Sequence, residues 1–261
     1  MSGMGLDLYF ATELAPCPYL EGRLERRLVT AIAGVDADAR HGRLMAAGFR
    51  RSQRFAYRPV CPGCSACVPV RIPVAHFVMS RAWRRILRAN ADLEAALRPP
   101  VATPEQFALF QRYLASRHGD GGMSEMSFSD YQAMVGESSV GTCLIEWRCP
   151  ARRLMAVSLT DRAPGALSGV YKFFEPEAPR RSLGTMIILW HVEHAARLGL
   201  AHVYLGYWIA QSPKMAYKAR FQPLERLGPL GWEPLEPAPP PMAPEAQPAI
   251  AQRSCEKMRT L

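Results

Sequence analysis

The second half of the chain carries its apolar residues in the pattern of buried strands and one amphipathic helix. Three successive strands are expected at residues 144–148, 154–161 and 166–174, the middle one alternating or continuous in apolar residues. An amphipathic helix is expected from Leu183 to Leu198, and Gly199 follows it as a stop signal. A further strand covers residues 203–208. Strands, a helix and a strand in this order predict an α+β fold.

The first half of the chain has weaker periodicity and more turn residues. Residues 6–72 are predicted to be rich in loops, with one short helix near Ala39–Ala47. Residues 80–97 are predicted to form a basic helix, with Ser80 as its N-cap, apolar side chains near one face and Pro99 after its end. Its other face carries Arg81, Arg84, Arg85 and Arg88. Further helices are expected after Thr103-Pro104 and over residues 128–135.

These patterns divide the chain into three parts. Residues 1–98 form an N-terminal region rich in cysteine and arginine, and residues 99–233 form the α+β domain. Residues 234–261 are rich in Pro, Ala and Glu, a composition that buries too little apolar surface to fold, so we expect a disordered tail.

The composition is that of an ordinary soluble protein, with 49% hydrophobic and 21% charged residues. No apolar run approaches the roughly 20 residues that span a bilayer. The segment from Met1 to Phe10 lacks the basic start and long apolar stretch of a signal peptide. We therefore expect no membrane association and a cytoplasmic location, where the seven cysteines stay reduced.

Positive charge is concentrated in the N-terminal region. The net charge is +9, and the segment from Met1 to Arg98 contributes +7 of it, with 15 Arg and no Lys against 8 Asp and Glu. The preference for Arg over Lys is equally explained by an arginine-rich proteome. The clustering is the stronger signal, and it favours a polyanionic partner such as nucleic acid.

Three cysteines are spaced two residues apart in a turn, in the sequence Cys61-Pro-Gly-Cys64-Ser-Ala-Cys67. Thiols in such a turn can converge on one metal, and zinc or an iron–sulfur cluster then needs a fourth ligand. Cys17 and His76 are the two candidates for it. The alternative is a turn lined with thiols that packs against the core without a metal.

Three further stretches carry groups that bind anions. Residues 50–58 mix arginines, among them Arg50, Arg51 and Arg58, with aromatic rings, as nucleic-acid surfaces do, although a charge run is often only a solvated face. The turn Arg180-Arg181-Ser-Leu-Gly184-Thr opens a helix, whose free N–H groups favour an anion, but this signal is weak alone. Lys214 and Lys218 lie on one face of a predicted helix after Ser212-Pro213, where they suit a phosphate or carboxylate unless they are ordinary surface lysines.

Together these stretches resemble the bacterial leucyl-tRNA–protein transferases, relatives of the eukaryotic arginyl-tRNA–protein transferases. The resemblance covers nearly the whole chain before Trp232 and lies in Cys17–Leu20, Gly48–Ser52, Tyr57–Pro59, Cys61–Arg71, Ser80-Arg81, Arg84-Arg85, Arg88, Asn90, His118–Met123, Leu167–Pro176, Arg181–Leu189 and Tyr204–Leu227. One departure is Glu175 before Pro176, where the family usually has Asp. The proline-rich tail is not a family feature.

The resemblance implies a GNAT-like acyltransferase core in which aminoacyl-tRNA replaces acetyl-coenzyme A. It further implies transfer of leucine from leucyl-tRNA to the N-terminal Asp or Glu of proteins, which marks them for N-degron degradation. The chemistry requires no cofactor, because the ester bond of the aminoacyl-tRNA supplies the driving force. Zinc or an iron–sulfur cluster at Cys17, Cys61, Cys64 and Cys67 remains a separate question.

For this reaction we assign roles to the candidate residues as hypotheses. Asp161, at a strand end, takes or orients the proton of the attacking amine, and Tyr207, Lys214 and Lys218 contact the tRNA end or the developing oxyanion. The substrate-binding candidates are Arg50, Arg51, Arg58, Arg180, Arg181, Gly184 and Lys218, with the arginines of residues 50–58 recognising the acidic acceptor. Two alternatives are an N-acetyltransferase that uses acetyl-coenzyme A and a non-catalytic RNA-binding or iron–sulfur sensor protein.

Overall fold

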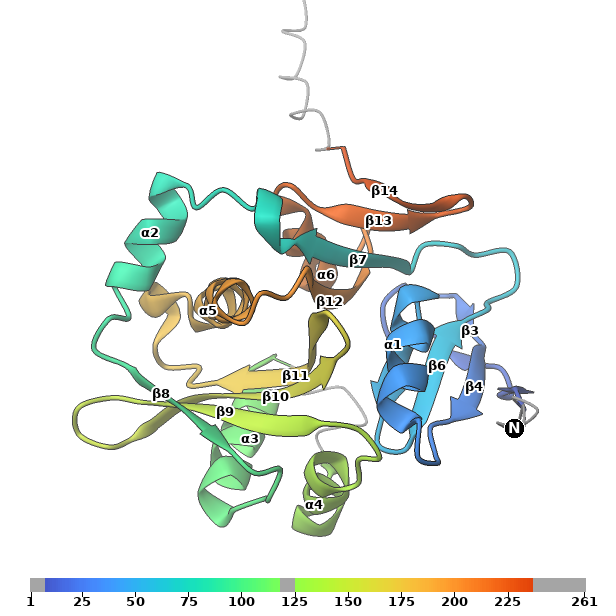
Figure 1. Ribbon diagram of the computed structural model, residues 1–261. Helices are drawn as coiled ribbons and strands as arrows, with labels where there is room; N and C mark the ends of the chain where they lie inside the picture. Colours follow the sequence, from blue (N-terminus) through green and yellow to red (C-terminus); the bar gives the residue numbers. More distant parts are fainter. Residues whose placement is uncertain (1–7, 118–124, 237–261) are drawn as a thin grey trace, which may run out of the picture.

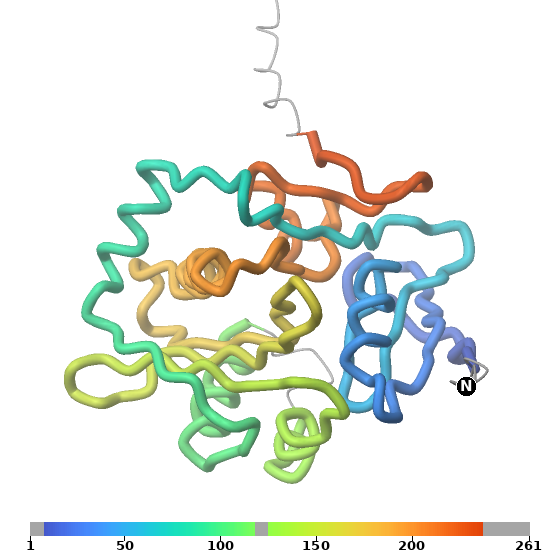
Figure 2. The backbone as a smooth tube through the Cα atoms, in the orientation of Figure 1, coloured from blue at the N-terminus to red at the C-terminus, as the bar shows by residue number. Residues whose placement is uncertain are grey.

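The computed structural model describes residues 8–117 and 125–236 and consists mainly of two β-sheets that lie side by side (Figure 1). The backbone trace shows the N-terminal segment, which contains the smaller sheet, lying beside the rest of the chain (Figure 2). The stretch His118–Met123 and residues 237–261 of the predicted tail lie outside the described residues.

The large sheet has eight strands and contains the elements predicted for an acyltransferase core. Its strands, in spatial order, are β14 (Gly231–Pro234), β13 (Glu225–Gly228), β7 (Val68–Pro73), β12 (His202–Trp208), β11 (Ala166–Phe174), β10 (Leu154–Ala163), β9 (Thr142–Arg148) and β8 (Glu94–Arg98). Strands β9, β10 and β11 are antiparallel neighbours, and β12 returns parallel to β11 after a helix. The predicted α+β fold with a GNAT-like order of elements is confirmed.

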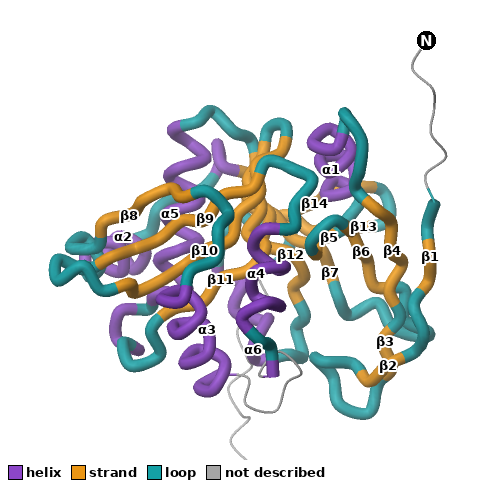
Figure 3. The backbone as a smooth tube through the Cα atoms, turned by 90° about the horizontal axis from the view of Figure 1, so that it is seen from below, coloured by secondary structure: helices purple, strands orange, loops and turns teal. Residues whose placement is uncertain are grey.

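Helices cover both faces of the large sheet (Figure 3). One face packs against α5 (Leu183–Arg197), and the other against α3 (Pro104–Arg117) and α4 (Phe128–Gly136). Neighbouring residues of β10 face opposite ways, as strand geometry requires: Ala156 packs with α5, whereas Val157 packs with α3 and α4. The helices predicted near these positions are therefore confirmed to within a few residues.

The small sheet corrects the expectation that residues 6–72 are mostly loop. It contains β1 (Phe10–Ala11), β4 (Arg27–Ala31), β6 (Phe55–Pro59) and β5 (Arg50–Ser52), and α1 (Ala37–Ala46) packs on it. A separate strand pair joins β2 (Ala15–Pro16) to β3 (Leu24–Glu25). The sheet was missed because its strands are short and rich in arginine, so they bury few side chains: Ile32, Leu44, Phe49 and Ala56 form much of its core.

The basic helix predicted over residues 80–97 is wrong beyond Arg88. Helix α2 (Arg81–Arg88) begins as expected, with the Ser80 hydroxyl accepting a hydrogen bond from the Trp83 amide. The Asn90 side chain then donates to the main-chain oxygens of Ile86 and Arg181, which ends the helix against a neighbouring turn. The chain continues as β8, since pairing with β9 outweighs the high helix propensity of its Glu, Ala, Leu and Arg residues.

The predicted boundary at residue 98 does not separate two structural units. Strands β7 and β8 both come from residues 1–98, yet both belong to the large sheet. The start of the predicted tail is also packed, because Leu235 is buried and its amide donates to the Leu224 oxygen. The remaining short helices are η1 (Val74–His76), η3 (Pro179–Arg181), α6 (Pro213–Ala216) and η4 (Tyr217–Arg220).

His191 on α5 makes the stability of the fold sensitive to acid. The ring is 3% exposed, with Nε2 at 2.9 Å from the Thr160 hydroxyl, and burial, aided by nearby Lys172, lowers its pKa to about 3. The unfolded chain binds a proton near pH 6.5, whereas the folded chain does not until about pH 3. The uncharged His191 therefore contributes its full share to the free energy of unfolding above pH 6.5. This share is lost as the pH falls, by about 3 kcal/mol between pH 7 and pH 4.

Urea unfolding at a series of pH values should show this slope in the unmodified protein and a shallower one in a His191→Gln variant. Replacing the exposed His76 by Gln is the matched control and should leave the slope unchanged. Equal slopes in all three proteins would contradict the assignment to His191.

Candidate functional site

The central feature of the large sheet is a junction where β11 and β12 stop pairing. Their parallel ladder covers only three residue pairs, the last of which is Ser168 with Tyr204. Beyond this pair each strand contains one bulged residue. Val170 is the extra residue of β11 in its pairing with β10, and Leu205 is the extra residue of β12 in its pairing with β7. Such bulges bend a strand away from its partner and leave main-chain groups unpaired.

The side chain of Arg50 fills this junction. Its Nη2 donates to the carbonyl oxygens of Gly169 and Val170, both at 2.9 Å, and its Nη1 donates to the Leu205 oxygen at 3.3 Å. Gly206 allows this approach, because a Cβ atom there would lie 1.3 Å from Nη1 of Arg50. The junction is therefore closed by a guanidinium from the small sheet rather than by strand pairing.

Two lysines lie close to Arg50. Lys172 on β11 donates to the Gly184 oxygen at 3.0 Å, and its Nζ lies 5.5 Å from the centre of the Tyr217 ring. Lys218 is 5% exposed and donates to the Tyr207 oxygen. Burial, with Arg50 nearby, lowers the pKa of Lys172 to about 7, and burial with both neighbouring cations lowers the pKa of Lys218 well below its usual range.

We call Arg50, Lys172 and Lys218 the cation cluster. Among the described residues, their hydrogen bonds run to main-chain oxygens, apart from one contact of Lys218 with the Met215 sulfur. Within residues 8–117 and 125–236, none of the three forms an ion pair. The cluster thus holds the fixed charge of Arg50 and two lysines, and its partners in the described part of the chain are carbonyl dipoles rather than carboxylates.

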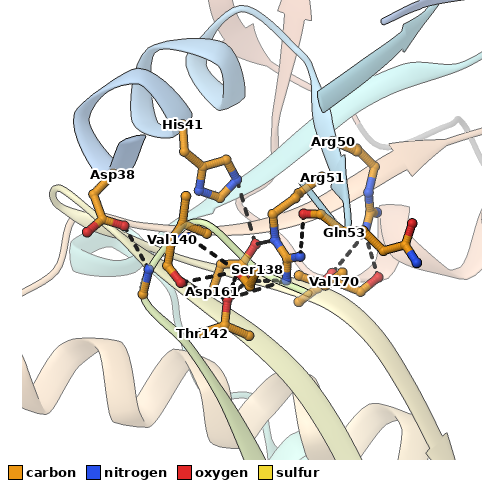
Figure 4. A network of polar contacts seen from close by, with 12 residues as sticks. Asp38, His41, Arg50, Arg51, Gln53, Ser138, Val140, Thr142, Asp161 and Val170 are labelled. Atoms are coloured by element: carbon orange, nitrogen blue, oxygen red, sulfur yellow. Dashed lines mark hydrogen bonds and ion pairs between the residues drawn. The ribbon is translucent and has the colours of Figure 1, made fainter. Parts of the chain in front are cut away.

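Asp161 occupies a different place from the one its predicted role requires. It is fully buried, and its carboxylate accepts from Nε and Nη2 of Arg51 at 2.6 and 2.7 Å and from the Thr142 hydroxyl at 2.8 Å. His41 Nε2 lies 3.6 Å from the same group. Figure 4 shows Arg50 and Arg51, adjacent on β5, pointing into separate networks. In this structure the carboxylate is closed to solvent and bound by Arg51 and Thr142, so we assign Asp161 and Arg51 a structural role in place of the roles we expected.

Tyr207 is also committed to the fold. Its side chain is 2% exposed, and its hydroxyl donates to the main-chain oxygens of Gly48 and Tyr57 at 3.0 and 3.1 Å. Burial raises the pKa of this phenol. Tyr207 therefore ties the two sheets together and does not reach a substrate, which corrects its predicted contact with the tRNA end. Lys214, in contrast, is exposed at α6, and its predicted contact with the tRNA end stays a prediction.

Some of the other predicted binding residues are also bound within the protein, whereas others are open to solvent. Arg58 donates to the Ala47 oxygen and lies over the Phe49 ring, and Arg181 pairs with Asn90 and Asp92. Arg180 is exposed, so an anion can reach it. The turn before α5 is a 3-10 turn, and Ser182 makes no capping hydrogen bond. Gly184 packs against the Phe174 ring, where a Cβ would lie 2.9 Å from it.

Comparison with known proteins places the chain in a family. Residues 15–85 match the N-terminal model, and residues 105–228 the C-terminal model, of arginine-tRNA-protein transferases. A protein of Gluconacetobacter diazotrophicus named aspartate/glutamate leucyltransferase is 53% identical over 230 residues, 88% of each chain. A protein of the same name from Paramagnetospirillum magneticum is 52% identical and covers 86% of this chain and 92% of that one. The chain belongs to the arginine-tRNA-protein transferase family.

Solved structures resemble this family member only distantly. The C-terminal domain of a putative lysylphosphatidylglycerol synthetase from Agrobacterium fabrum aligns with a TM-score of 0.42 and 15% identity, over 64% of this chain and 50% of that one. A fungal GCN5-related glucosamine N-acetyltransferase region aligns with a TM-score of 0.41 and 9% identity, over 78% and 22% of the two chains. Neither likeness is close enough to carry a functional argument.

The four cysteines of the predicted metal site are neighbours in this transferase. Burial, together with the nearby Cys17, Cys61 and Cys64, raises the pKa of the Cys67 thiol to about 12. However, in the described part of the chain no group of three or more His, Cys, Asp or Glu side chains is arranged to hold a metal ion. The predicted convergence of the four thiols on one metal is therefore not present, and His76 is exposed.

Sequence reasoning missed Lys172 and Gly206, the residues that make the junction of this transferase unusual. A signal for Lys172 was available: it is one of only four lysines among 32 basic residues, and it interrupts an apolar strand. Gly206 gave a weaker signal, a glycine inside a strand, which often marks a bulge or a close approach of another group.

In the described residues no helix is long and apolar enough to cross a membrane.

Proposed function

We propose that this transferase moves leucine from leucyl-tRNA to the N-terminal Asp or Glu of protein substrates. The observation that carries the proposal is the identity of 53% and 52%, over most of both chains, with relatives named aspartate/glutamate leucyltransferase. Charged tRNA and proteins with acidic N-termini are then its two partners. The reaction takes place in the cytoplasm and marks the acceptor for N-degron degradation.

The reaction is the aminolysis of an activated ester. The lone pair of the acceptor's α-amine attacks the leucyl carbonyl carbon, a C–N bond forms, and the C–O bond to the tRNA ribose breaks. The amine proton is transferred to the departing ribose oxygen, so the reaction needs no oxidant, nucleotide or metal for its balance. An α-amine has a pKa near 7.7–8.0, so roughly a tenth of it is neutral at pH 7. Correct positioning of the amine and the ester is then the main requirement.

The distribution of exposed arginine supports a tRNA partner. On α2 the four arginines are exposed to solvent, while Trp83 on the same helix is buried. The four are Arg81, Arg84, Arg85 and Arg88. A row of exposed guanidinium groups on one helix suits the phosphates of a folded RNA, which attract cations and form bidentate hydrogen bonds with Arg.

The proposal is tested by incubating the full chain with tRNAs charged with different labelled amino acids and with peptides that begin with Asp, Glu, Arg or Lys. We expect label only from leucyl-tRNA and only on the Asp and Glu peptides. Labelled acetyl-coenzyme A in a parallel reaction should give no product. Acetyl transfer without leucyl transfer, or RNA binding without any transfer, would contradict the proposal and favour the corresponding alternative.

A further inference from the structure

The cation cluster is unusual because three basic side chains, Lys218 buried and Arg50 and Lys172 half-buried, lie close together with no carboxylate partner among the described residues. Buried cations are normally paired with carboxylates, since removing a charge from water is unfavourable unless another charge compensates. Here Arg50 supplies a fixed charge near both lysines, and in the described part of the chain the three side chains hydrogen-bond to main-chain oxygens and the Met215 sulfur, with the Tyr217 ring beside Lys172. Such an arrangement produces a positive electrostatic potential that an anionic ligand would compensate.

The choice of lysine at two positions of the cluster adds a second observation. Only four of the chain's 32 basic residues are lysines, and two of these four are Lys172 and Lys218. Arginine stays protonated when buried, whereas lysine can lose its proton in an apolar environment. Both lysines have lowered pKa values, caused first by burial and then by neighbouring cations. The folded protein thus tolerates the cluster without a ligand, because the two lysines can lose their protons. An anionic ligand that keeps both lysines protonated would stabilise the cluster most.

We infer that Lys172 receives the side-chain carboxylate of the acceptor's N-terminal Asp or Glu, with Arg50 and Lys218 nearby strengthening the attraction. This inference rests on the proposed function and names the residues that select an acidic acceptor. Lys172 is the contact because it is only partly buried, whereas Lys218 is 5% exposed. The Lys172 ammonium has three N–H donors, of which the Gly184 oxygen takes one.

Arg50 takes part in a different way from the lysines. Its three hydrogen bonds close the junction between β11 and β12, so its guanidinium is held in place whether or not an acceptor is bound. It supplies a fixed positive charge near Lys172, as its effect on the pKa of that residue shows. Arg50 is therefore a positioning residue, and the lysines are the groups to vary.

A carboxylate fits the cluster better than a phosphate of tRNA. The cluster lies beside buried main chain at the strand junction, and a phosphodiester carries a ribose on either side of its charged oxygens. A side-chain carboxylate is small, planar and singly charged, so it needs less space beside the half-buried Lys172 than a phosphodiester does. The exposed arginines of α2 already offer the phosphates a solvent-accessible surface.

The test compares acceptor peptides that differ only in charge. Four peptides of one sequence begin with Asp, Asn, Glu or Gln, and kcat/KM is measured for each at a fixed, saturating concentration of leucyl-tRNA. The proteins are the unmodified chain, Lys172→Gln, Lys218→Gln and Lys172→Arg. Arg43→Gln, which also removes one positive charge but from an exposed position on α1, is the matched control.

The measured quantity is the ratio of kcat/KM for Asp over Asn, and for Glu over Gln, within each protein. A ratio cancels any loss of folded enzyme, so a partly unfolded variant still gives an answer. We expect Lys172→Gln to lower the ratio roughly tenfold or more, and Lys218→Gln to lower it less but in the same direction. Lys172→Arg should keep most of the ratio, and Arg43→Gln all of it.

Two results would overturn the inference while leaving the proposed function intact. One is an equal loss of activity with acidic and amide acceptors in Lys172→Gln. The other is an unchanged ratio together with a raised KM for leucyl-tRNA, measured in a separate titration of the tRNA at a fixed peptide concentration, which would make Lys172 a phosphate contact. Failure of the unmodified chain to transfer leucine to any of the four peptides would instead remove the proposed function, and the inference with it.

Discussion

Substitution of Gly206 by alanine is expected to lower the free energy of unfolding by more than about 3 kcal/mol. The backbone at Gly206 has a φ of +75°, which by itself disfavours alanine by roughly 1 kcal/mol. The larger part comes from Arg50, because the new Cβ would lie 1.3 Å from its Nη1 and force the guanidinium out of the junction. The oxygens of Gly169, Val170 and Leu205 would then lose their donor, at about 1–3 kcal/mol for each one left buried and unpaired.

Gly165 provides a matched control for this prediction. Its φ is +70°, almost the same as that of Gly206, but a Cβ there would meet nothing within 4 Å. Gly165→Ala therefore carries the backbone strain without the displacement of Arg50, and urea unfolding of the two variants separates the two contributions. In an Arg50→Ala background, Gly206→Ala should cost only about as much as Gly165→Ala. Similar losses for both glycines in the unmodified background would show that Arg50 does not close the junction.

The parts of the fold that could be predicted from sequence are those determined by local pattern. The strands at residues 144–148, 154–161 and 166–174 and the helix from Leu183 follow from apolar spacing, and Ser80 was recognised as a cap from its position alone. Helix α2 ends earlier than its composition suggests, because the Asn90 side chain bonds to Arg181 on a distant turn. That contact depends on tertiary structure, which helical periodicity does not report.

The candidate site was harder to predict because its residues are brought together by strand pairing. Arg50 and Arg51 were recognised as candidates, but their separate roles follow from β5 alternation: one side chain enters the strand junction and its neighbour pairs with Asp161. No local signal distinguishes the two. Lys172 stands in an apolar strand far from Lys218 in sequence, and only the return of β12 beside β11 brings both lysines near Arg50.

Asp161 shows how a plausible chemical role can be replaced by a structural one. A carboxylate near a strand end is a natural candidate for handling a proton, and the sequence gives no reason to reject it. The decision comes from β5, a strand of the small sheet that places Arg51 against it. The ion pair thereby anchors the small sheet to β10 of the large one, with the Thr142 hydroxyl from β9 completing the contact.

Asp161→Asn is therefore expected to destabilise the protein by about 3–5 kcal/mol, since removing one partner leaves the Arg51 charge buried and unpaired. The side chains of Arg51 and Asp161 are 1% and 0% exposed, so water cannot replace the lost carboxylate. Glu94→Gln is the control, because its ion pair with Arg152 is exposed on both sides and should contribute less than about 1 kcal/mol. Urea unfolding of the two variants gives the comparison directly.

The same variant separates the structural role from the catalytic one. Single-turnover leucyl transfer, measured at low temperature and divided by the folded fraction, should remain within about threefold for Asp161→Asn, because the carboxylate does not touch the substrate. A double variant, Arg51→Met with Asp161→Leu, should recover much of the lost stability, as apolar replacements of buried ion pairs often do. An Asp161→Asn protein that keeps its stability but loses transfer would mean the opposite: that the carboxylate leaves Arg51 during the reaction and accepts the amine proton.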